Sequence, residues 1–195
     1  NLISVDFSPD GKWVVAAGDN SAAYVFDTAT GKVKTTFDNY ESPEANANWA
    51  TFAPDSQRVA VAGSDGRLYV FDGSTGETIY SVPGSDVESA TNVQVSTAEF
   101  TPNGKFLAAG INENDSENDS SKTRHYIRIW DAASGQPVKT IEDRAVVTEY
   151  IWKIAISPDS SLMTVGFDES TGIVPIWNIA PGNDQWQKVK ELKGN

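Results

Sequence analysis

The chain has 195 residues, a formal net charge of −12 and a mean hydropathy of −0.37. It has no apolar run near the roughly 18 residues that a membrane helix needs, and its acidity disfavours nucleic acid and anionic membranes, since phosphate binding needs clustered Lys and Arg. The absence of Cys excludes disulfides and thiolate metal sites.

Four related units follow one another, each opened by an apolar strand and a turn built on Pro-Asp or Pro-Asn. The turns are FSPDG at 7–11, FAPDS at 52–56, FTPNG at 100–104 and ISPDS at 156–160, and their starts lie 45, 48 and 56 residues apart. Pro presets φ in such a turn, and Asp or Asn followed by Gly or Ser closes it. A period of this length predicts one supersecondary unit copied along the chain.

After each turn the unit continues with a strand of small apolar residues and then an alternating strand that ends in an aromatic residue and Asp or Asn. The third strand and its Gly turn are AYVFDTATGK at 23–32, RLYVFDGSTGE at 67–77, IRIWDAASGQ at 127–136 and VPIWNIAPGN at 174–183. A fourth strand follows each Gly turn. The alternation predicts four antiparallel strands per unit and no helix, with Trp130 and Trp177 in the core. Pro175 lies inside a third strand, where it removes a ladder N–H and predicts a bulge or a loosened last unit.

One such four-stranded sheet cannot bury both of its faces, and stacking several sheets around an axis solves this problem. We therefore predict an all-β fold, a β-propeller with four blades of four antiparallel strands. The chain is expected to be a single module over residues 1–195, with blades at about 1–40, 46–84, 93–142 and 150–193.

These units resemble the repeats of WD-repeat propellers in the aromatic-Asp ending, the Ser-Pro-Asp-Gly turn and the period. The resemblance implies a rigid platform for protein–protein contact without chemistry of its own. The usual Gly-His dipeptide is missing from every unit, and the Asp that the family places six residues before the aromatic is present as Asp65 in the second unit only. The buried His–Ser/Thr–Trp–Asp network of the family is therefore not expected.

Four blades of this size predict an open arc rather than a closed ring, because propellers of the WD type usually have seven blades. The end blades of an arc expose apolar faces, and exposed apolar patches mark interfaces. We expect half of a larger ring of about eight blades. A second copy, a different chain or further sequence completes it, and a closed four-bladed ring is the alternative.

Nearly all of the net charge belongs to one rim of the predicted module. This acidic rim consists of the connections between second and third strands and those that lead to the next unit. It spans 18–23, 38–48, 63–66, 83–95, 110–125, 142–150 and 166–172. It holds 16 of the 27 acidic residues and three of the 15 basic ones. Such a rim attracts basic partners, although long loops also collect charge for solubility alone.

Candidate partner-binding residues are the acids and aromatics of this rim, because aromatic anchors beside carboxylates suit a peptide that carries Lys or Arg. They are Tyr40, Glu41, Glu44, Asp86, Glu88, Asp115, Glu117, Asp119, Tyr126, Glu149 and Tyr150. Tyr40 and Tyr150 are the expected surface aromatics. Trp49 and Trp152, at the starts of first strands, are expected to pack between blades.

The third unit carries an insertion, NENDSENDSSKTRH at 112–125, which is predicted to be a surface loop without apolar residues. Asn114 and Asn118 begin glycosylation sequons that matter only in a secretory setting. Ser116 and Ser120 are candidate phosphorylation sites, and the acids suggest Ca²⁺ without the Gly of an EF-hand loop.

The function expected is a non-enzymatic interaction platform that presents its acidic face to a basic partner or peptide. The alternative is a structural module that completes a propeller ring by dimerisation, and a quinoprotein-like or lactonase-like enzyme is disfavoured. The only histidine, His125, lies in the insertion, so neither a Ser-His-Asp triad nor a metal or cofactor site is expected. The compartment stays open.

Overall fold

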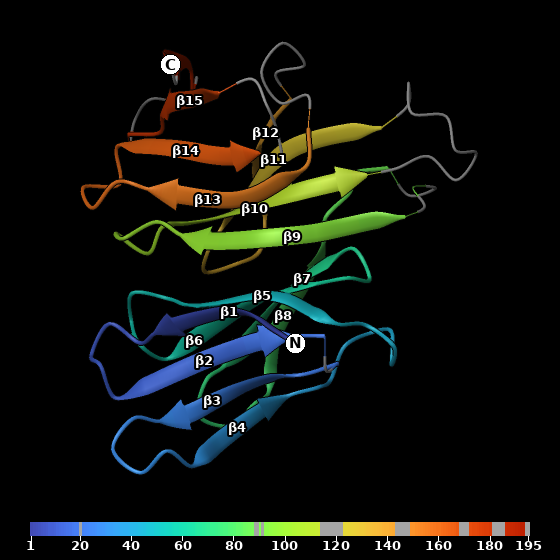
Figure 1. The fold of residues 1–195 in the computed structure, drawn as a ribbon, viewed down its shortest axis with the longest axis vertical. Helices are drawn as coiled ribbons and strands as arrows, with labels where there is room; N and C mark the ends of the chain where they lie inside the picture. Colours follow the sequence, from blue (N-terminus) through green and yellow to red (C-terminus); the bar gives the residue numbers. More distant parts are fainter. Residues whose placement is uncertain are drawn as a thin grey trace.

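The computed structural model describes residues 1–19, 21–87, 90, 92–113, 123–142, 149–167, 172–180 and 186–193. In these residues the chain forms four four-stranded antiparallel sheets whose strands follow one another in sequence order (Figure 1). This confirms the predicted all-β fold of four propeller-type blades. None of the described segments is a helix of the length and apolarity needed to cross a membrane.

The strand bounds agree with the unit pattern of the sequence. The first sheet holds β1 (Leu2–Phe7), β2 (Trp13–Gly18), β3 (Ala23–Asp27) and β4 (Val33–Phe37). The second holds β5 (Ala47–Phe52), β6 (Arg58–Gly63), β7 (Arg67–Asp72) and β8 (Thr78–Pro83). The third holds β9 (Val93–Phe100), β10 (Phe106–Glu113), β11 (Arg124–Asp131) and β12 (Pro137–Ile141). The fourth holds β13 (Ile151–Ile156), β14 (Leu162–Phe167), β15 (Ile173–Asn178) and β16 (Lys188–Lys193).

The Asp or Asn that ends each third strand closes the turn into the fourth. The Oδ1 atom of Asp72 accepts hydrogen bonds from the backbone N–H groups of Ser74 at 2.8 Å and Thr75 at 2.9 Å. Asp27 and Asp131 cap their turns in the same way. Asn178 does so through one bond, from the N–H of Ala180 at 3.0 Å. The repeated motif is thus explained by the turn it builds, because a side-chain acceptor replaces a backbone partner there.

These caps make the fold sensitive to acid. Hydrogen bonds to the carboxylate lower the pKa of Asp27, Asp72 and Asp131, chiefly bonds from Thr30 N–H, the Ser74 hydroxyl and the Ser134 hydroxyl. A depressed folded-state pKa stabilises the fold above the unfolded pKa of about 3.9 and loses that effect as the pH falls through the folded value.

We therefore expect the triple replacement of Asp27, Asp72 and Asp131 by Asn to reduce the loss of stability between pH 4 and pH 2. Asn keeps a turn acceptor, as Asn178 demonstrates, but not the charge, so the variant should lose at pH 7 the stability that the three ionised carboxylates contribute there. Urea unfolding at pH 7, 4 and 2.5 measures both. An unchanged slope in the triple variant would show that other groups control acid unfolding.

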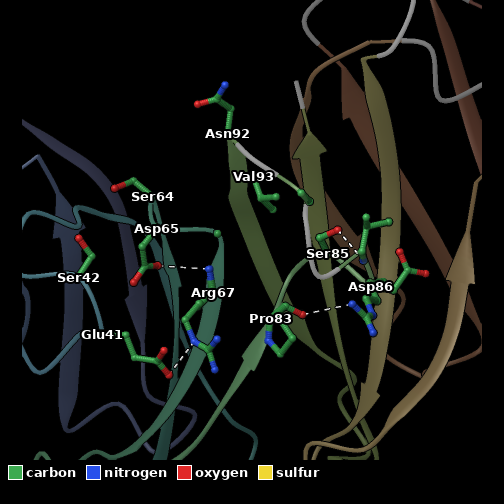
Figure 2. A pocket seen from close by; sticks show the side chains of 14 residues that line it. Glu41, Ser42, Ser64, Asp65, Arg67, Pro83, Ser85, Asp86, Asn92 and Val93 are labelled. Carbon is green, nitrogen blue, oxygen red and sulfur yellow. Dashed lines mark hydrogen bonds and ion pairs between the residues drawn. The ribbon is translucent and has the colours of Figure 1, made fainter. Parts of the chain in front are cut away.

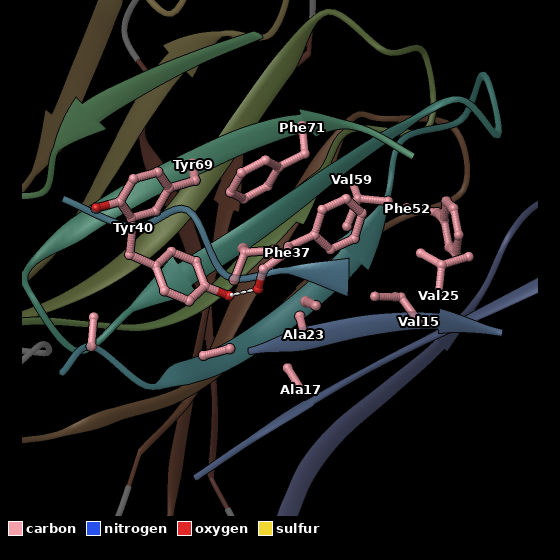
Figure 3. Close-up of a cluster of buried hydrophobic side chains, with 14 residues drawn as sticks. Val15, Ala17, Ala23, Val25, Phe37, Tyr40, Phe52, Val59, Tyr69 and Phe71 are labelled. Carbon is pink, nitrogen blue, oxygen red and sulfur yellow. Dashed lines mark hydrogen bonds between the residues drawn. The ribbon is translucent and has the colours of Figure 1, made fainter. Parts of the chain in front are cut away.

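The core lies in the three joints between neighbouring sheets. At the first joint, Phe37 from β4 stacks on Phe71 from β7 with ring centroids 4.8 Å apart, and Val15 and Val25 pack against Phe52 (Figure 3). The second and third joints hold similar clusters that include the indoles of Trp130 and Trp177, each 1% exposed. The prediction that these two tryptophans are core residues is confirmed.

Trp49 packs against the second joint, as expected, but Trp152 is about half exposed and that expectation is wrong. Trp152 lies on β13 and packs against Tyr150 in a tilted arrangement, with ring centroids 4.9 Å apart. It therefore covers a neighbouring aromatic ring instead of entering the joint between the third and fourth sheets.

The four sheets form a row, and the first and last sheets lie at its two ends (Figure 1). Strand β1 contacts β5, β5 contacts β9 and β9 contacts β13, so the four first strands run side by side in chain order. Each middle sheet therefore has two covered faces, one toward the preceding sheet and one toward the following sheet.

The outer face of the first sheet, which points away from the second sheet, is apolar. Val5 and Phe7 are 67% and 66% exposed, and strand register puts them on one face with Val14 and Phe26. Because the second unit begins 45 residues later, these positions correspond to the buried residues of the first joint: Ala50, Phe52, Val59 and Phe71. The first sheet thus carries the side chains of a joint without a neighbour to cover them.

The outer face of the last sheet, which points away from the third sheet, is open as well. Strand pairing places Val174 opposite Leu192, and these side chains are 38% and 44% exposed. Gly166 of β14 has open space where a Cβ would lie, whereas the corresponding Gly110 of β10 lies against Ile151. The prediction that both end blades expose an apolar face is therefore confirmed for the described residues.

The insertion is not wholly a loop, because its ends extend β10 and β11, which pair Asn112 with His125 and Glu113 with Arg124. Its residues 114–122 lie outside the described part of the chain, as do the sequons and the two candidate phosphorylation sites. The loosening expected at Pro175 is present between β14 and β15, whose pairing stops at Ile176, next to the proline. The register shift between β15 and β16 is not specific to Pro175, because the other three blades have the same shift between their third and fourth strands.

Candidate functional site

Connections far apart in sequence meet at one rim and enclose a cavity of about 940 Å³ between the second and third sheets (Figure 2). One wall comes from Glu41 and Ser42, which precede β5, and from the turn 64–66 with Arg67. The other wall comes from the segment after β8, the start of β9 and Arg128 of β11. This cavity lies in the described part of the acidic rim.

The cavity exists because two side chains that fill the first joint are replaced at the second. In the first joint, Tyr40 and Tyr69 pack with ring centroids 5.1 Å apart and close the rim end. The corresponding positions at the second joint are Ser85, 45 residues after Tyr40, and Arg128, two residues before the aromatic of the third strand. A small side chain and a polar one leave the rim end of this joint open.

Asp65 is the central carboxylate of the first wall. Its Oδ2 accepts a hydrogen bond of 2.6 Å from the Tyr69 hydroxyl, and its Oδ1 accepts one of 3.2 Å from the backbone N–H of Arg67. Burial and the bond to Asp65 raise the pKa of Tyr69 far above its usual value, so the hydroxyl remains a donor. No described cation lies within ion-pair distance of Asp65.

Glu41 is paired within the same wall. Its Oε1 lies 2.9 Å from Nε of Arg67, and it also accepts a hydrogen bond of 3.0 Å from the Ser81 hydroxyl. Arg67 in turn donates to the Ser81 hydroxyl at 3.0 Å. This arrangement neutralises one of the rim carboxylates.

On the third sheet, Arg124 holds three carboxylates beside the second wall. Its nitrogens lie 3.2 Å from Glu142, 3.5 Å from Glu113 and 4.0 Å from Asp86. Its guanidinium carbon also lies 4.9 Å from the ring centroid of Tyr126, a cation–π distance. The negative charge of this wall is therefore partly compensated.

Arg128 forms the floor of the second wall and is only 9% exposed. Its Nη1 donates to the backbone carbonyl oxygens of Pro83 at 3.3 Å and Gly84 at 3.0 Å (the bond to Pro83 is dashed in Figure 2). Within the described residues no carboxylate lies within 4.0 Å of it. The cavity thus has an uncompensated carboxylate on one wall and an uncompensated guanidinium on the other.

The candidate residues predicted from the sequence only partly converge here. Glu41 and Asp86 line the cavity, whereas Glu44 is exposed outside its lining, and Glu149 is half-buried on another part of the rim. Glu88 and the insertion residues Asp115, Glu117 and Asp119 lie outside the described part of the chain.

The aromatic candidates are mostly unavailable as surface anchors. Tyr40 is 9% exposed and donates its hydroxyl to the carbonyl of Phe37 at 2.8 Å, so the expectation of a surface tyrosine there is wrong. Tyr126 is fully buried, with its hydroxyl donating to Glu113 at 2.8 Å, and the expected anchor is wrong there too. Tyr150 is half-buried and donates to Gln94 at 2.6 Å.

Sequence reasoning missed both arginines of the cavity. Arg67 and Arg128 lie inside third strands, and the rim was counted from the connections alone. A signal was present for Arg128, because the corresponding positions of the other units hold Tyr24, Tyr69 and Pro175. A charged residue at an otherwise uncharged inward position marks a joint that differs from the others.

No three His, Asp or Glu side chains converge as a metal-binding group in the described ranges. His125 is half-buried, with Nδ1 2.8 Å from Oδ1 of Asn112, and burial lowers its pKa. Its ring packs edge-on against Tyr150, with centroids 6.5 Å apart. These contacts account for the histidine as part of the rim's packing.

The fold and its turn caps define a protein of propeller-type blades stacked through apolar joints. Residues 1–27 and 31–72 match the family model of the WD domain, G-beta repeat. The first matched segment contains β1 to β3 and the second contains β4 to β7, so this part of the chain is similar to WD40 repeats, and the four sheets fit the propeller-like arrangement of WD-repeat proteins. No curated protein shows significant similarity to the chain.

Proposed function

We propose that this chain is a non-enzymatic platform whose acidic rim binds a basic protein partner or peptide through the cavity between the second and third sheets. WD40 repeats are generally protein-interaction or scaffold modules and are typically non-enzymatic. The observation that carries the proposal is a cavity of about 940 Å³ at a joint whose neighbour is plugged by tyrosines.

Asp65 is the residue that a Lys or Arg of the partner would contact. Glu41 and Asp86 have arginine partners, at 2.9 Å and 4.0 Å respectively, whereas Asp65 has hydrogen bonds but no counter-ion among the described residues. A carboxylate has about four lone-pair positions, so two hydrogen bonds leave room for a cation. Fixed by Tyr69, the Asp65 carboxylate is also preorganised, which lowers the entropic cost of binding.

The test uses a blocked peptide, acetyl-Gly-Lys-Lys-Gly-amide, titrated by calorimetry at low and high salt. We expect affinity to fall with salt and Asp65→Asn to weaken binding about fivefold to tenfold, since an exposed or half-buried charge pair contributes about 1 kcal/mol. Asn keeps an acceptor for Tyr69. The control is Glu77→Gln, an exposed acid at the opposite rim. Binding that ignores salt, or equal effects of the two variants, would overturn the proposal.

The second candidate function is a structural module that completes a propeller ring by dimerisation. The two open end faces favour it. The outer face of the first sheet carries the kinds of side chain with which the second sheet packs against the first. The outer face of the last sheet carries Val174, Ile176 and Leu192, at positions that would face a further sheet. A two-fold pair would bring each last sheet onto the first sheet of the other copy. The Phe7 variant described in the Discussion tests this candidate.

A further inference from the structure

We propose that Arg128 binds a carboxylate of the partner, so that the segment accommodated in the cavity carries an acidic side chain next to its basic one. This inference rests on the proposed function and deepens it, because it names the second charge that the cavity recognises. The ligand class is a short peptide segment with Asp or Glu beside Lys or Arg.

The first argument is that Arg128 differs from the other arginines. In the described ranges, each of the other three has a carboxylate within ion-pair distance: Arg58 with Asp55 at 2.7 Å, Arg67 with Glu41 at 2.9 Å and Arg124 with Glu142 at 3.2 Å. Arg128 is the most deeply buried of the four and has none. A buried charge without a counter-ion is costly, so a bound anion would relieve that cost.

The second argument is the position in the fold. The register of β10 and β11 places Arg128 opposite Ala109, as β6 and β7 place Tyr69 opposite Val61. Tyrosine at this position fills the first joint without a charge. The guanidinium carbon of Arg128 lies 5.5 Å from the ring centroid of Trp130, but the arginine has no acid partner among the described residues, and an anionic ligand accounts for this.

The third argument is the orientation of the guanidinium. The carbonyl oxygens of Pro83 and Gly84 both accept from Nη1, which fixes the group against the segment after β8. No hydrogen bond within the described part of the chain uses Nε or Nη2. These two N–H groups form the fork that binds a carboxylate through two parallel bonds.

The opposing walls then define the ligand. An anion alone would meet the carboxylate of Asp65, which has no described counter-ion, in the same cavity and would be repelled by it. A basic side chain beside the carboxylate removes this repulsion by pairing with Asp65. The combination also explains why the lining carries both signs of charge instead of acids alone.

The experiment compares blocked peptides by calorimetry at low salt. Acetyl-Gly-Asp-Lys-Gly-amide is the probe, and acetyl-Gly-Asn-Lys-Gly-amide lacks its carboxylate. A third peptide, acetyl-Gly-Asn-Lys-Gly with a free C-terminus, tests a main-chain carboxylate as the source. We expect the wild type to prefer the Asp peptide over the blocked Asn peptide about tenfold. Arg128→Gln should abolish this preference, and Arg128→Lys should retain a small part of it because an ammonium lacks the fork.

The matched control is Arg58→Gln, which removes an ion-paired arginine at the opposite rim and should leave the tenfold preference intact. Thermal unfolding of each variant checks that it folds. Equal affinity of the wild type for the Asp and Asn peptides, or loss of the preference in Arg58→Gln, would overturn the inference. If the Lys-Lys peptide binds but Asp gives no advantage, this inference fails alone; if no peptide containing Lys binds, the proposed function fails.

Discussion

Replacing Phe52 by Ala is expected to lower the free energy of unfolding by about 3–5 kcal/mol, because it leaves a cavity in the first joint. Phe52 is 6% exposed and belongs to the cluster that joins the first two sheets. The same replacement at Phe7, the corresponding residue of the first unit, is expected to change stability by less than about 0.5 kcal/mol, since that side chain is 66% exposed.

Urea unfolding of the two variants at several protein concentrations makes this comparison. The two phenylalanines have the same position in their strands, each before a Pro-Asp turn. The difference in unfolding free energy between the two variants therefore measures the effect of the neighbouring sheet, which covers Phe52 but not Phe7. A large loss from Phe7→Ala that grows with protein concentration would show that the open face is covered in solution by a second copy. That result would favour ring completion over the platform.

A second matched pair, two glycine substitutions, tests the faces of the third and fourth sheets that point away from the preceding sheet. Gly110→Ala is expected to destabilise the fold by about 1–3 kcal/mol, because its Cβ would lie 2.6 Å from Cγ2 of Ile151 and overpack the third joint. Gly166→Ala, at the corresponding position of the fourth sheet, meets nothing within 4 Å. There the loss of backbone freedom in the unfolded chain should raise stability by about 0.4–1 kcal/mol.

Thermal unfolding followed by circular dichroism measures both glycine variants. Neither position has a positive φ, so the comparison is free of backbone strain. Equal destabilisation by the two substitutions would contradict an open outer face on the fourth sheet. It would show instead that some other group packs against β14.

The strands could be predicted from the sequence because their signals are local. Each Pro-Asp turn, each alternating run and each aromatic-Asp ending is built from residues close together in the chain, and the caps at Asp27, Asp72 and Asp131 use neighbours two and three residues away. The open end faces were predictable as well, since they follow from counting units.

The site was predicted less well because it depends on which side chains meet across a joint. Tyr40 follows a strand in a polar connection, and only the neighbouring sheet, with Tyr69 and Phe71, makes it a buried plug. The charges of Glu41 and Asp86 were predicted without the arginines that compensate them. Counting charge by connection therefore overstated the acidity of this part of the rim.

The most direct test of the proposed function is to locate the bound acetyl-Gly-Lys-Lys-Gly-amide on the isotope-labelled chain by amide chemical shifts. The account predicts that the shifted amides cluster at Ser64–Arg67 and at Ser85–Val87, which line the cavity. The turn glycines of the opposite rim, Gly11 and Gly104, should not move. Shifts that gather at the opposite rim or on the open faces of β2 and β14, with the cavity amides unchanged, would contradict it.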